Sequence, residues 1–232
     1  MNTVVIIPTY NEAKNIAKII DSVNSLKIKN LKILVVDDSS PDGTAKIAKD
    51  KDVNLLINKK KLGLGHAYLK GMEYAIKHMN VNLFIQIDAD FSHDPNDIPK
   101  FIKKITQGYD FVIGSRYIKG GSIPDNWGFH RKLISKLGNK FIGIFLGKNI
   151  SDWSTGYRAI KKEVFIKLED KLTKDLFQGY TYQIGFLDLA LKNKFEVGKI
   201  PIHFKNREHG ISKFGSEYFI NTFKYLLSSK RK

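Results

Sequence analysis

The chain contains 232 residues, 42% of them hydrophobic, with no cysteine and a formal net charge of +16. This apolar content can bury a full core and excludes a disordered chain, while the lack of cysteine excludes disulfides and thiolate metal sites. No apolar run reaches the roughly 20 residues that a membrane-spanning helix needs, and the N-terminus has no basic leader, so we expect a soluble or peripheral protein.

The excess of positive charge indicates an anionic partner, and nucleic acid, nucleotide phosphates and an acidic membrane surface all satisfy it. The lysines are spread along the chain instead of clustering with aromatic residues on one element, which argues against nucleic acid. Only five of the 39 basic residues are arginines. Because Arg binds phosphate or carboxylate through a planar fork that Lys lacks, these arginines are candidates for a binding site.

Strand and helix patterns alternate over the first half of the chain. Apolar, β-branched runs predict strands at 3–7, 32–36, 53–57, 83–87 and 110–115. Apolar residues at helical spacing predict helices between them, the first carrying Ile16 to Leu26, the second ending near residue 50 and the third at 63–79. This alternation predicts a mostly parallel sheet with right-handed crossovers.

The alternation breaks after residue 115. The remaining patterns predict a helix at 129–147, a polar loop at 151–158, a helix at 179–193, a strand near 196–205 and a helix at about 215–229. The sequence contains no repeat, linker or low-complexity tract, so we expect one α/β domain.

Acidic residues follow three of the predicted strands, as Glu12, the pair Asp37 and Asp38, and the pair Asp88 and Asp90. A single acid in this place is usually a helix cap or part of a solvated turn. Three acidic groups at the carboxyl edge of one sheet would repel one another unless a cation or ligand offset their charge. Carboxylates spaced i, i+2, as in Asp88 and Asp90, lie on one side of an extended chain and suit a divalent cation that holds a diphosphate.

Seven motifs occur along the chain in the order PTYNE (8–12), VVDDSSPDG (35–43), GLGHAYLKG (63–71), DADFSH (88–93), GSRYIKGG (114–121), SDWSTGYR (151–158) and REHGISK (207–213). Together they resemble the dolichyl-phosphate mannosyltransferases, which are inverting family 2 glycosyltransferases that make polyprenyl phosphate mannose from GDP-mannose. The first and fourth motifs are common to many family 2 enzymes, whereas the last three point to polyprenyl phosphate acceptors.

The resemblance implies a GT-A fold, a single α/β, Rossmann-like domain with a mostly parallel central sheet and flanking helices. It implies a catalytic domain at 1–213 and an amphipathic C-terminal helix with a basic tail at 214–232. The implied activity is inverting, metal-dependent transfer of mannose from GDP-mannose to a polyprenyl (dolichyl) phosphate. The protein would be cytoplasmic and peripherally associated with the cytoplasmic face of a membrane.

The resemblance also implies roles for individual residues. The guanosine end of the donor would be held by Pro8, Tyr10, Glu12, Val36 and Asp38. The ribose and diphosphate would lie beside Asp88 and Ala89, and Mg²⁺ or Mn²⁺ would be bound by Asp88, Asp90 and Ser92. Donor phosphates would contact Arg207 and Lys213, and the lipid phosphate would contact Arg116, Arg131 and Ser135. Asp90, Arg116 and Arg131 would be the catalytic residues.

Three positions leave open questions. Ser92 stands where some relatives carry Gln, and a hydroxyl is the weaker metal ligand. Gly185 stands where an acid is expected, so the role of that acid is either unfilled or taken by Asp188. Arg158 either belongs to the motif arginines or forms a structural salt bridge with Asp152.

The lipid acceptor requires contact with a membrane. Two apolar helix faces flanked by lysines, at 133–146 and 218–227, are candidates for docking at the bilayer surface or on a small membrane partner subunit. For 133–146 an ordinary core helix is an equally good interpretation, whereas the basic tail favours membrane or partner contact for the last helix. Rival functions are the same chemistry with another nucleotide sugar such as UDP-glucose, a nucleotide-sugar-binding subunit without turnover and, as the weakest, nucleic-acid binding.

Overall fold

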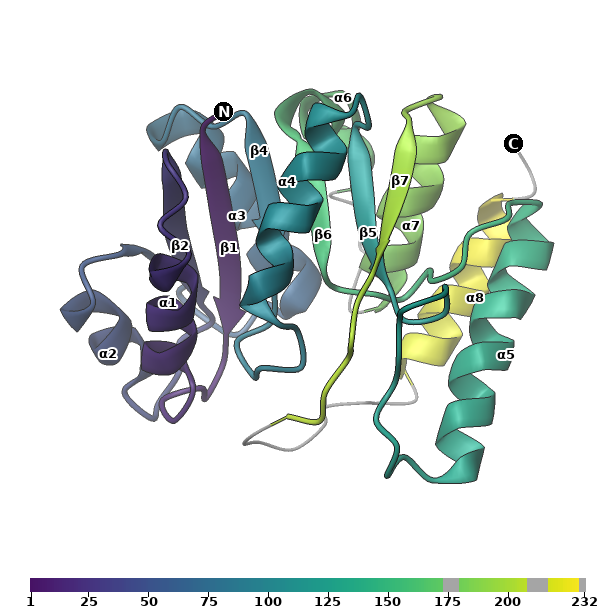
Figure 1. Ribbon diagram of the computed structural model, residues 1–232, viewed down its shortest axis with the longest axis horizontal. Helices are drawn as coiled ribbons and strands as arrows, with labels where there is room; N and C mark the ends of the chain where they lie inside the picture. Colours follow the sequence, from purple (N-terminus) through teal and green to yellow (C-terminus); the bar gives the residue numbers. More distant parts are fainter. Residues whose placement is uncertain (173–179, 208–216, 230–232) are drawn as a thin grey trace.

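The computed structural model describes residues 1–172, 180–207 and 217–229. Within these residues, seven strands form one sheet in the order β3-β2-β1-β4-β6-β5-β7 (Figure 1). The strands are β1 (Thr3–Thr9), β2 (Leu31–Asp37), β3 (Asn54–Ile57), β4 (Leu83–Gln86), β5 (Phe111–Ser115), β6 (Arg158–Lys161) and β7 (Val197–Pro201). All neighbouring strands in this sheet are parallel except β6, which is antiparallel to both β4 and β5.

Helices cover both faces of the sheet (Figure 1). One face packs against α1 (Ile16–Ser25), α2 (Thr44–Asp50) and α4 (Ile98–Thr106), which follows the short 3₁₀ helix η1 (Pro95–Asp97). The other face packs against α3 (Leu64–His78), α6 (Lys162–Leu172) and α7 (Tyr180–Lys192). Beyond α7 lie α8 (Glu217–Ser229) and α5 (Phe129–Leu146), side by side at one end of the molecule.

The central strands are apolar throughout because both of their faces are covered. In β1, Val4 and Ile6 contact the core under α3, while Val5 and Ile7 contact the core under α1. Continuous apolar runs of this kind are typical of buried parallel strands. The expected α/β fold with a mostly parallel sheet is therefore confirmed.

The sequence pattern did not predict β6 and α6. β6 has only four residues and passes into α6 without a glycine or proline between them, so residues 158–172 carry no turn signal. Because β6 runs antiparallel, its first residue lies at the edge where β4 and β5 end. This reversal brings the polar loop 151–157 to the carboxyl edge of the sheet, where open α/β sheets bind ligands.

The last helix is packed on the domain instead of extending from it. Tyr225 and Leu226 are buried, and the Tyr225 hydroxyl donates a hydrogen bond of 2.6 Å to Asp188 Oδ2 on α7. Leu226, expected on a docking face, is thus a core residue. The basic tail at 230–232 lies outside the described residues. In the described part of the chain, none of the helices is long and apolar enough to cross a bilayer.

Candidate active site

A cavity of about 250 Å³ opens at the carboxyl edge of the sheet, where β1, β2 and β4 end and β6 begins. It is lined by Pro8, Thr9, Tyr10, Glu12, Asp38, Lys61, Gly63, Leu64, Ala67, Asp88, Ala89, Asp90, His93, Arg116, Ser154, Thr155, Gly156, Gln183, Phe204 and Arg207. These residues come from loops far apart in the sequence. Parallel topology alone explains why the segments after β1, β2 and β4 meet there.

Most of the residues predicted to bind the donor line this cavity, and so does Arg116, which was predicted to bind the lipid phosphate. The donor residues in the lining are Pro8, Tyr10, Glu12, Asp38, Asp88, Ala89, Asp90 and Arg207. Val36 does not line the cavity, because its side chain lies in the core against α3. Ser92, Arg131 and Ser135 also lie outside the lining, and Lys213 falls outside the described residues.

Hydrogen-bond donors already surround the acidic pair after β2. Asp37 accepts hydrogen bonds from Thr9 Oγ1 at 2.9 Å and from both N and Oγ of Ser40. Asp38 accepts from Asn58 Nδ2 at 2.6 Å and Gly63 N at 2.7 Å. The expected repulsion among acids at this edge is therefore offset here by fixed dipoles, and no cation is required at these two residues.

The loop after β1 carries Tyr10 and Glu12 to one end of the cavity. Lys61 Nζ lies 4.1 Å from the centre of the Tyr10 ring, a cation–π contact on one ring face. Glu12 is held from both sides, since its N–H donates to Thr44 Oγ1 and its carboxylate accepts from Asn15 Nδ2. Tyr10 and Glu12 are thus fixed relative to the β2 loop, with Lys61 as a basic neighbour that the sequence did not single out.

Asp88 and Asp90 follow β4 at the centre of the edge. Asp90 is buried, with Oδ1 accepting from Ser92 N at 3.0 Å and Oδ2 lying 3.0 Å from Arg207 Nε. Asp88 Oδ1 accepts from the Tyr68 hydroxyl at 3.3 Å. Burial raises the pKa of Asp88, and the nearby Asp90 raises it further.

His93 is the buried partner of this acidic pair. Its Nδ1 accepts a hydrogen bond from Asp88 N at 3.3 Å, and its ring packs against Tyr157 and Phe204. Burial lowers the pKa of His93, which favours the neutral imidazole at neutral pH. His93 therefore positions the main chain at Asp88 without adding a positive charge.

The residues at this edge fit a divalent cation that shares its ligands with a bound diphosphate. Asp88 and Asp90 supply oxygen ligands, the type that Mg²⁺ and Mn²⁺ prefer. The buried Ser92 Oγ has no hydrogen-bond partner among the described residues, so it also suits a ligand role, direct or through water. The described residues contain no group of three or more His, Asp or Glu side chains that could hold a metal ion, so the remaining ligands would have to come from the donor and from water.

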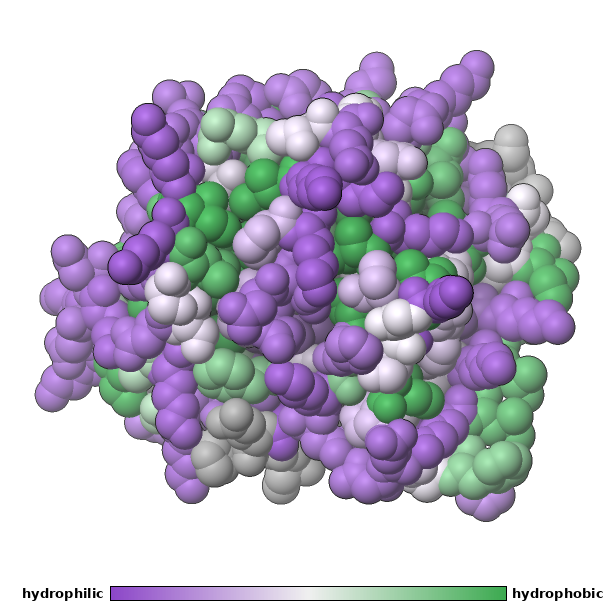
Figure 2. Space-filling model, in the orientation of Figure 1, coloured by the Kyte–Doolittle hydropathy of each residue, from purple (hydrophilic) through white to green (hydrophobic). Residues whose placement is uncertain are grey.

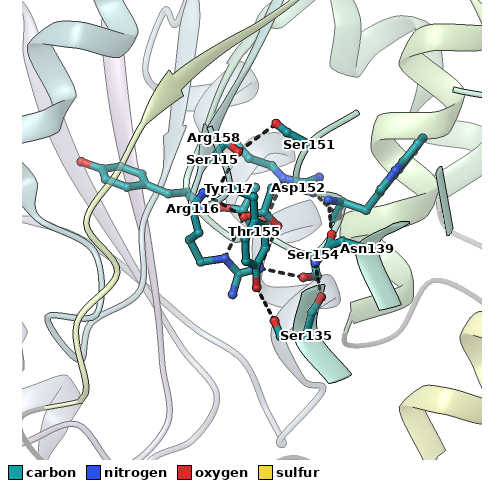
Figure 3. A network of polar contacts seen from close by, with 12 residues as sticks. Ser115, Arg116, Tyr117, Ser135, Asn139, Ser151, Asp152, Ser154, Thr155 and Arg158 are labelled. Atoms are coloured by element: carbon teal, nitrogen blue, oxygen red, sulfur yellow. Dashed lines mark hydrogen bonds and ion pairs between the residues drawn. The ribbon is translucent and has the colours of Figure 1, made fainter. Parts of the chain in front are cut away.

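Arg116 is held by a buried carboxylate (Figure 3). Its Nε and Nη2 each donate to Asp152 at 2.7 Å, Nη2 also contacts Ser154 Oγ at 2.8 Å, and the Arg116 main-chain N donates to Asp152 Oδ2. Asp152 is fully buried and Arg116 nearly so. One edge of the planar fork is therefore occupied by Asp152, and a phosphate would approach another side of the guanidinium.

Arg158 does not pair with Asp152. It is fully buried and donates to three carbonyl groups, those of Trp153, Thr155 and Gln183, at 3.1, 2.8 and 2.7 Å. Burial lowers the pKa of Arg158 to about 10. The salt bridge considered from the sequence is wrong because Asp152 is taken by Arg116. Arg158 instead anchors the main chain of the 151–157 loop and of α7.

Arg131 and Ser135 lie on the first turns of α5. The Arg131 guanidinium stacks 3.8 Å from the centre of the Trp127 ring. Ser135 Oγ shares a short hydrogen bond with the Tyr117 hydroxyl, and the Tyr117 ring lies 5.2 Å from the Arg116 guanidinium carbon. These contacts join α5 to the segment after β5, as Figure 3 shows for Ser135 and Tyr117.

Asp188 has a structural role and does not replace the acid that was expected at position 185. It is fully buried and binds Tyr225 and Ser229 of α8, as well as Lys192 one turn later. It does not line the cavity. The position of Gly185 is therefore not compensated by Asp188.

Several residues that line the cavity were not predicted from the sequence, among them Lys61, His93, Phe204 and Gln183. His93 belongs to the DADFSH motif. Phe204 and Gln183 lie in segments predicted only as a strand near 196–205 and a helix at 179–193. Their position in the cavity depends on long-range packing, which local periodicity does not encode.

The sequence of this chain matches a known protein family and is similar to known proteins. The profile of the family described as Glycosyl transferase family 2 matches residues 4–169. Polyprenol monophosphomannose synthase of Mycolicibacterium smegmatis is 39% identical, over 91% of this chain and 80% of that protein. Undecaprenyl-phosphate mannosyltransferase of Micrococcus luteus is 31% identical, over 99% of this chain and 96% of that protein.

Solved structures share the fold at low sequence identity. Glucosyl-3-phosphoglycerate synthase from Mycobacterium tuberculosis in complex with uridine diphosphate has a TM-score of 0.74 at 18% identity, over 98% of this chain and 79% of that chain. The same enzyme with Mn²⁺, uridine diphosphate and glucosyl-3-phosphoglycerate has a TM-score of 0.70 at 16% identity, over 99% of this chain and 78% of that chain. The likeness confirms the GT-A fold expected from the sequence.

Proposed function

The chain belongs to glycosyl transferase family 2 and, within it, to the relatives of the polyprenyl-phosphate mannosyltransferases, and from this premise we propose that it transfers mannose from GDP-mannose to a polyprenyl phosphate. The observation that carries the proposal is one cavity that combines Asp88 and Asp90 with Arg116 and Arg207. Such a set can hold a nucleoside diphosphate and an anionic acceptor together.

The donor would lie along the carboxyl edge of the sheet. Tyr10, Glu12 and Asp38 line the β1 and β2 end of the cavity and would contact the nucleoside, whereas Arg207, which pairs with Asp90, would contact the diphosphate. Asp88 and Asp90, with Ser92, would hold Mg²⁺ or Mn²⁺, which supplies neutralising charge to a departing diphosphate. Arg207 adds a second positive charge on the same side, so the leaving group would depart into a basic environment.

The acceptor would approach from the side of α5. A phosphate monoester has a second pKa near ~6 and is mostly a dianion at neutral pH, so its oxygen needs no strong general base. Arg116, fixed by Asp152, and Arg131 with Ser135 on α5 would orient that oxygen for in-line attack on the anomeric carbon. In-line displacement inverts the configuration. We therefore assign the protein groups to positioning and charge stabilisation and none to proton abstraction.

Among the described helices, α5 is the best candidate for contact with a membrane. Only Asn139, Ile142 and Gly143 of this helix are buried. Its exposed apolar residues are Phe129, Leu133, Ile134, Leu137, Phe141 and Ile144, and those of the neighbouring α8 are Ile220, Phe223 and Leu227. Figure 2 shows apolar side chains along the edge of the molecule occupied by α5. Monomeric domains rarely expose a contiguous apolar surface of this kind without an interaction partner.

The same helix carries Arg131 and Ser135 near its beginning and exposed lysines, Lys136 and Lys140, further along. A helix lying in the headgroup layer would place the acceptor residues at the depth of the lipid phosphate, with the lysines near anionic headgroups. We thus propose peripheral association with the cytoplasmic face of a membrane through α5. A small membrane partner subunit covering the same face is the alternative.

A donor screen tests the proposal. Purified protein is incubated with a short-chain polyprenyl phosphate, Mg²⁺ or Mn²⁺, and labelled GDP-mannose, GDP-glucose, UDP-glucose or UDP-mannose. Transfer from GDP-mannose at the highest rate, abolished by EDTA and by Asp90→Ala, is the expected result. Transfer from UDP-glucose alone would mean that the donor is UDP-glucose, while the proposed sugar transfer to a polyprenyl phosphate would stand. Tight nucleotide-sugar binding without turnover would indicate a binding subunit.

A further inference from the structure

Gln183 lines the cavity, and neither polar atom of its side-chain amide is satisfied. The residue lies in the first turn of α7, its side chain is 1% exposed, and it lines the cavity. Neither Oε1 nor Nε2 has a hydrogen-bond partner among the described residues. A buried polar atom without a partner destabilises the fold, so an amide with both atoms unsatisfied is unfavourable at a position that serves packing alone.

The main chain at Gln183 is held firmly in place. Its carbonyl accepts a 2.7 Å hydrogen bond from Nη1 of the fully buried Arg158, which also binds the carbonyls of Trp153 and Thr155. The cavity wall formed by Thr155 and Gly156 is therefore fixed to α7 through one guanidinium. An amide on this support is pre-organised to meet a ligand instead of adapting to it.

Gln86 provides an internal comparison. It is also a fully buried glutamine with an unsatisfied Oε1, but its Nε2 donates to the Tyr182 hydroxyl at 2.8 Å. It does not line the cavity. Gln86 thus has a structural partner away from the cavity, whereas Gln183 lines the cavity and its amide has none.

The order of the strands indicates which part of the donor reaches Gln183. Tyr10 and Asp38 follow β1 and β2, Asp88 follows the next strand, β4, and Arg158, which holds Gln183, begins β6 on the other side of β4. A donor with its nucleoside at β1 and β2 and its diphosphate at β4 would extend its sugar towards β6. The sugar end of the cavity is therefore the end that contains Gln183.

The lining at this end suits a hydroxylated ring better than a phosphate. Thr155 and Gly156, which Arg158 joins to Gln183, carry no charge. A Cβ at Gly156 would lie 3.4 Å from His93 Cε1 and 3.5 Å from Asp88 Oδ1, so the glycine leaves space next to these two side chains. Gln183 itself is neutral, and an amide can donate to one hydroxyl and accept from another. We propose that Gln183 binds hydroxyl groups of the donor sugar and determines which hexose is accepted. This inference rests on the proposed function, because it assumes a nucleotide sugar in the cavity.

The test compares Gln183→Met, which keeps the volume and removes both polar atoms, with the same substitution at Gln86. Affinities for GDP and for GDP-mannose are measured by calorimetry with Mg²⁺ and without acceptor, and thermal unfolding is recorded. For Gln183→Met we expect GDP affinity within twofold of wild type, GDP-mannose affinity about tenfold or more weaker, and an unchanged or raised Tm, because an unsatisfied amide is removed. For Gln86→Met we expect a lower Tm and an unchanged ratio of the two affinities.

Specificity provides a second measurement. The ratio of GDP-mannose to GDP-glucose affinity should move towards one in Gln183→Met, because a site that no longer pairs with hydroxyls loses its means of telling the sugars apart. Equal weakening of GDP and GDP-mannose, a fall in Tm at Gln183→Met, or unchanged values throughout would each overturn the inference. Wild-type protein that binds UDP-sugars instead would revise the proposed donor, and the same comparison with UDP and its sugar would still decide the role of Gln183.

Discussion

Arg207 Nε lies 3.0 Å from Asp90 Oδ2, so a basic residue in the segment after β7 is paired with the carboxylate assigned to the metal. The Arg207 side chain is 37% exposed and Asp90 is buried, which makes Arg207 the more movable partner. Without nucleotide, the guanidinium therefore supplies the positive charge that a divalent cation would otherwise bring to Asp90. A metal ion bound by Asp90 would compete with this ion pair for the same carboxylate.

Arg207→Gln should strengthen metal binding in the absence of nucleotide. Removing the competing charge should raise Mn²⁺ affinity several-fold, while GDP affinity falls because a diphosphate contact is lost. Mn²⁺ titration followed by electron paramagnetic resonance measures the first effect and calorimetry the second. Lys205→Gln is the matched control, since Lys205 pairs with Asp94 at 3.1 Å and lies outside the cavity lining. An Arg207→Gln variant with unaltered Mn²⁺ affinity would show that the ion pair does not compete.

Asp152→Asn should both destabilise the fold and weaken acceptor binding. The substitution leaves the nearly buried Arg116 without its charge partner and turns an amide N–H towards its donors, at a cost of about 3–5 kcal/mol. Urea unfolding measures the loss, and acceptor KM should rise more than donor KM because Arg116 is no longer held. Asp110→Asn, which breaks the partly exposed pair with Lys161, should cost only about 1 kcal/mol. Equal losses at the two sites would mean that the Arg116 pair is no more than a surface contact in energetic terms.

The order of strands and helices along the chain predicts where the acidic residues of this site lie. It does not predict the partners of the buried charged residues. Alternating apolar strands and helices fixed where the chain would place Asp38, Asp88 and Asp90, because parallel strands end at one edge. The partners of Arg158 and Asp188 were not predictable in the same way. Each of these residues has a charge that several distant groups could satisfy, and only the packing of α7 against α8 and against the 151–157 loop selects among them.

Arg131→Lys should impair acceptor use although the charge is kept. A lysine can reproduce neither the planar stacking 3.8 Å above Trp127 nor a two-pronged contact with phosphate. We expect acceptor KM to rise about tenfold and donor KM to stay within twofold, measured with a short-chain polyprenyl phosphate. Lys132→Met, which removes the neighbouring charge that contacts the Asp125 carbonyl, is the control and should change acceptor KM less than twofold. A change confined to donor KM would move Arg131 out of the acceptor site.

The exposed apolar face of α5 leads to a prediction about membrane binding. Leu137 and Ile144 are 53% and 72% exposed, and the double substitution to glutamate puts two charges where side chains would enter the headgroup boundary. Co-sedimentation with anionic vesicles should fall at least tenfold, and binding of the wild type should weaken with salt because lysines on the same helix contribute.

Ile166→Glu on α6 is the control for this experiment, since it charges an isoleucine on another helix that is 49% exposed, close to the 53% of Leu137. It should bind vesicles like the wild type. Turnover of a water-soluble, short-chain acceptor then separates the two roles of α5: the double variant should lose activity towards a long-chain acceptor in vesicles and keep most of its activity towards the soluble one. If the double variant and Ile166→Glu sediment alike, α5 does not contact the bilayer, and access to the lipid must come through a different surface or through a membrane partner subunit.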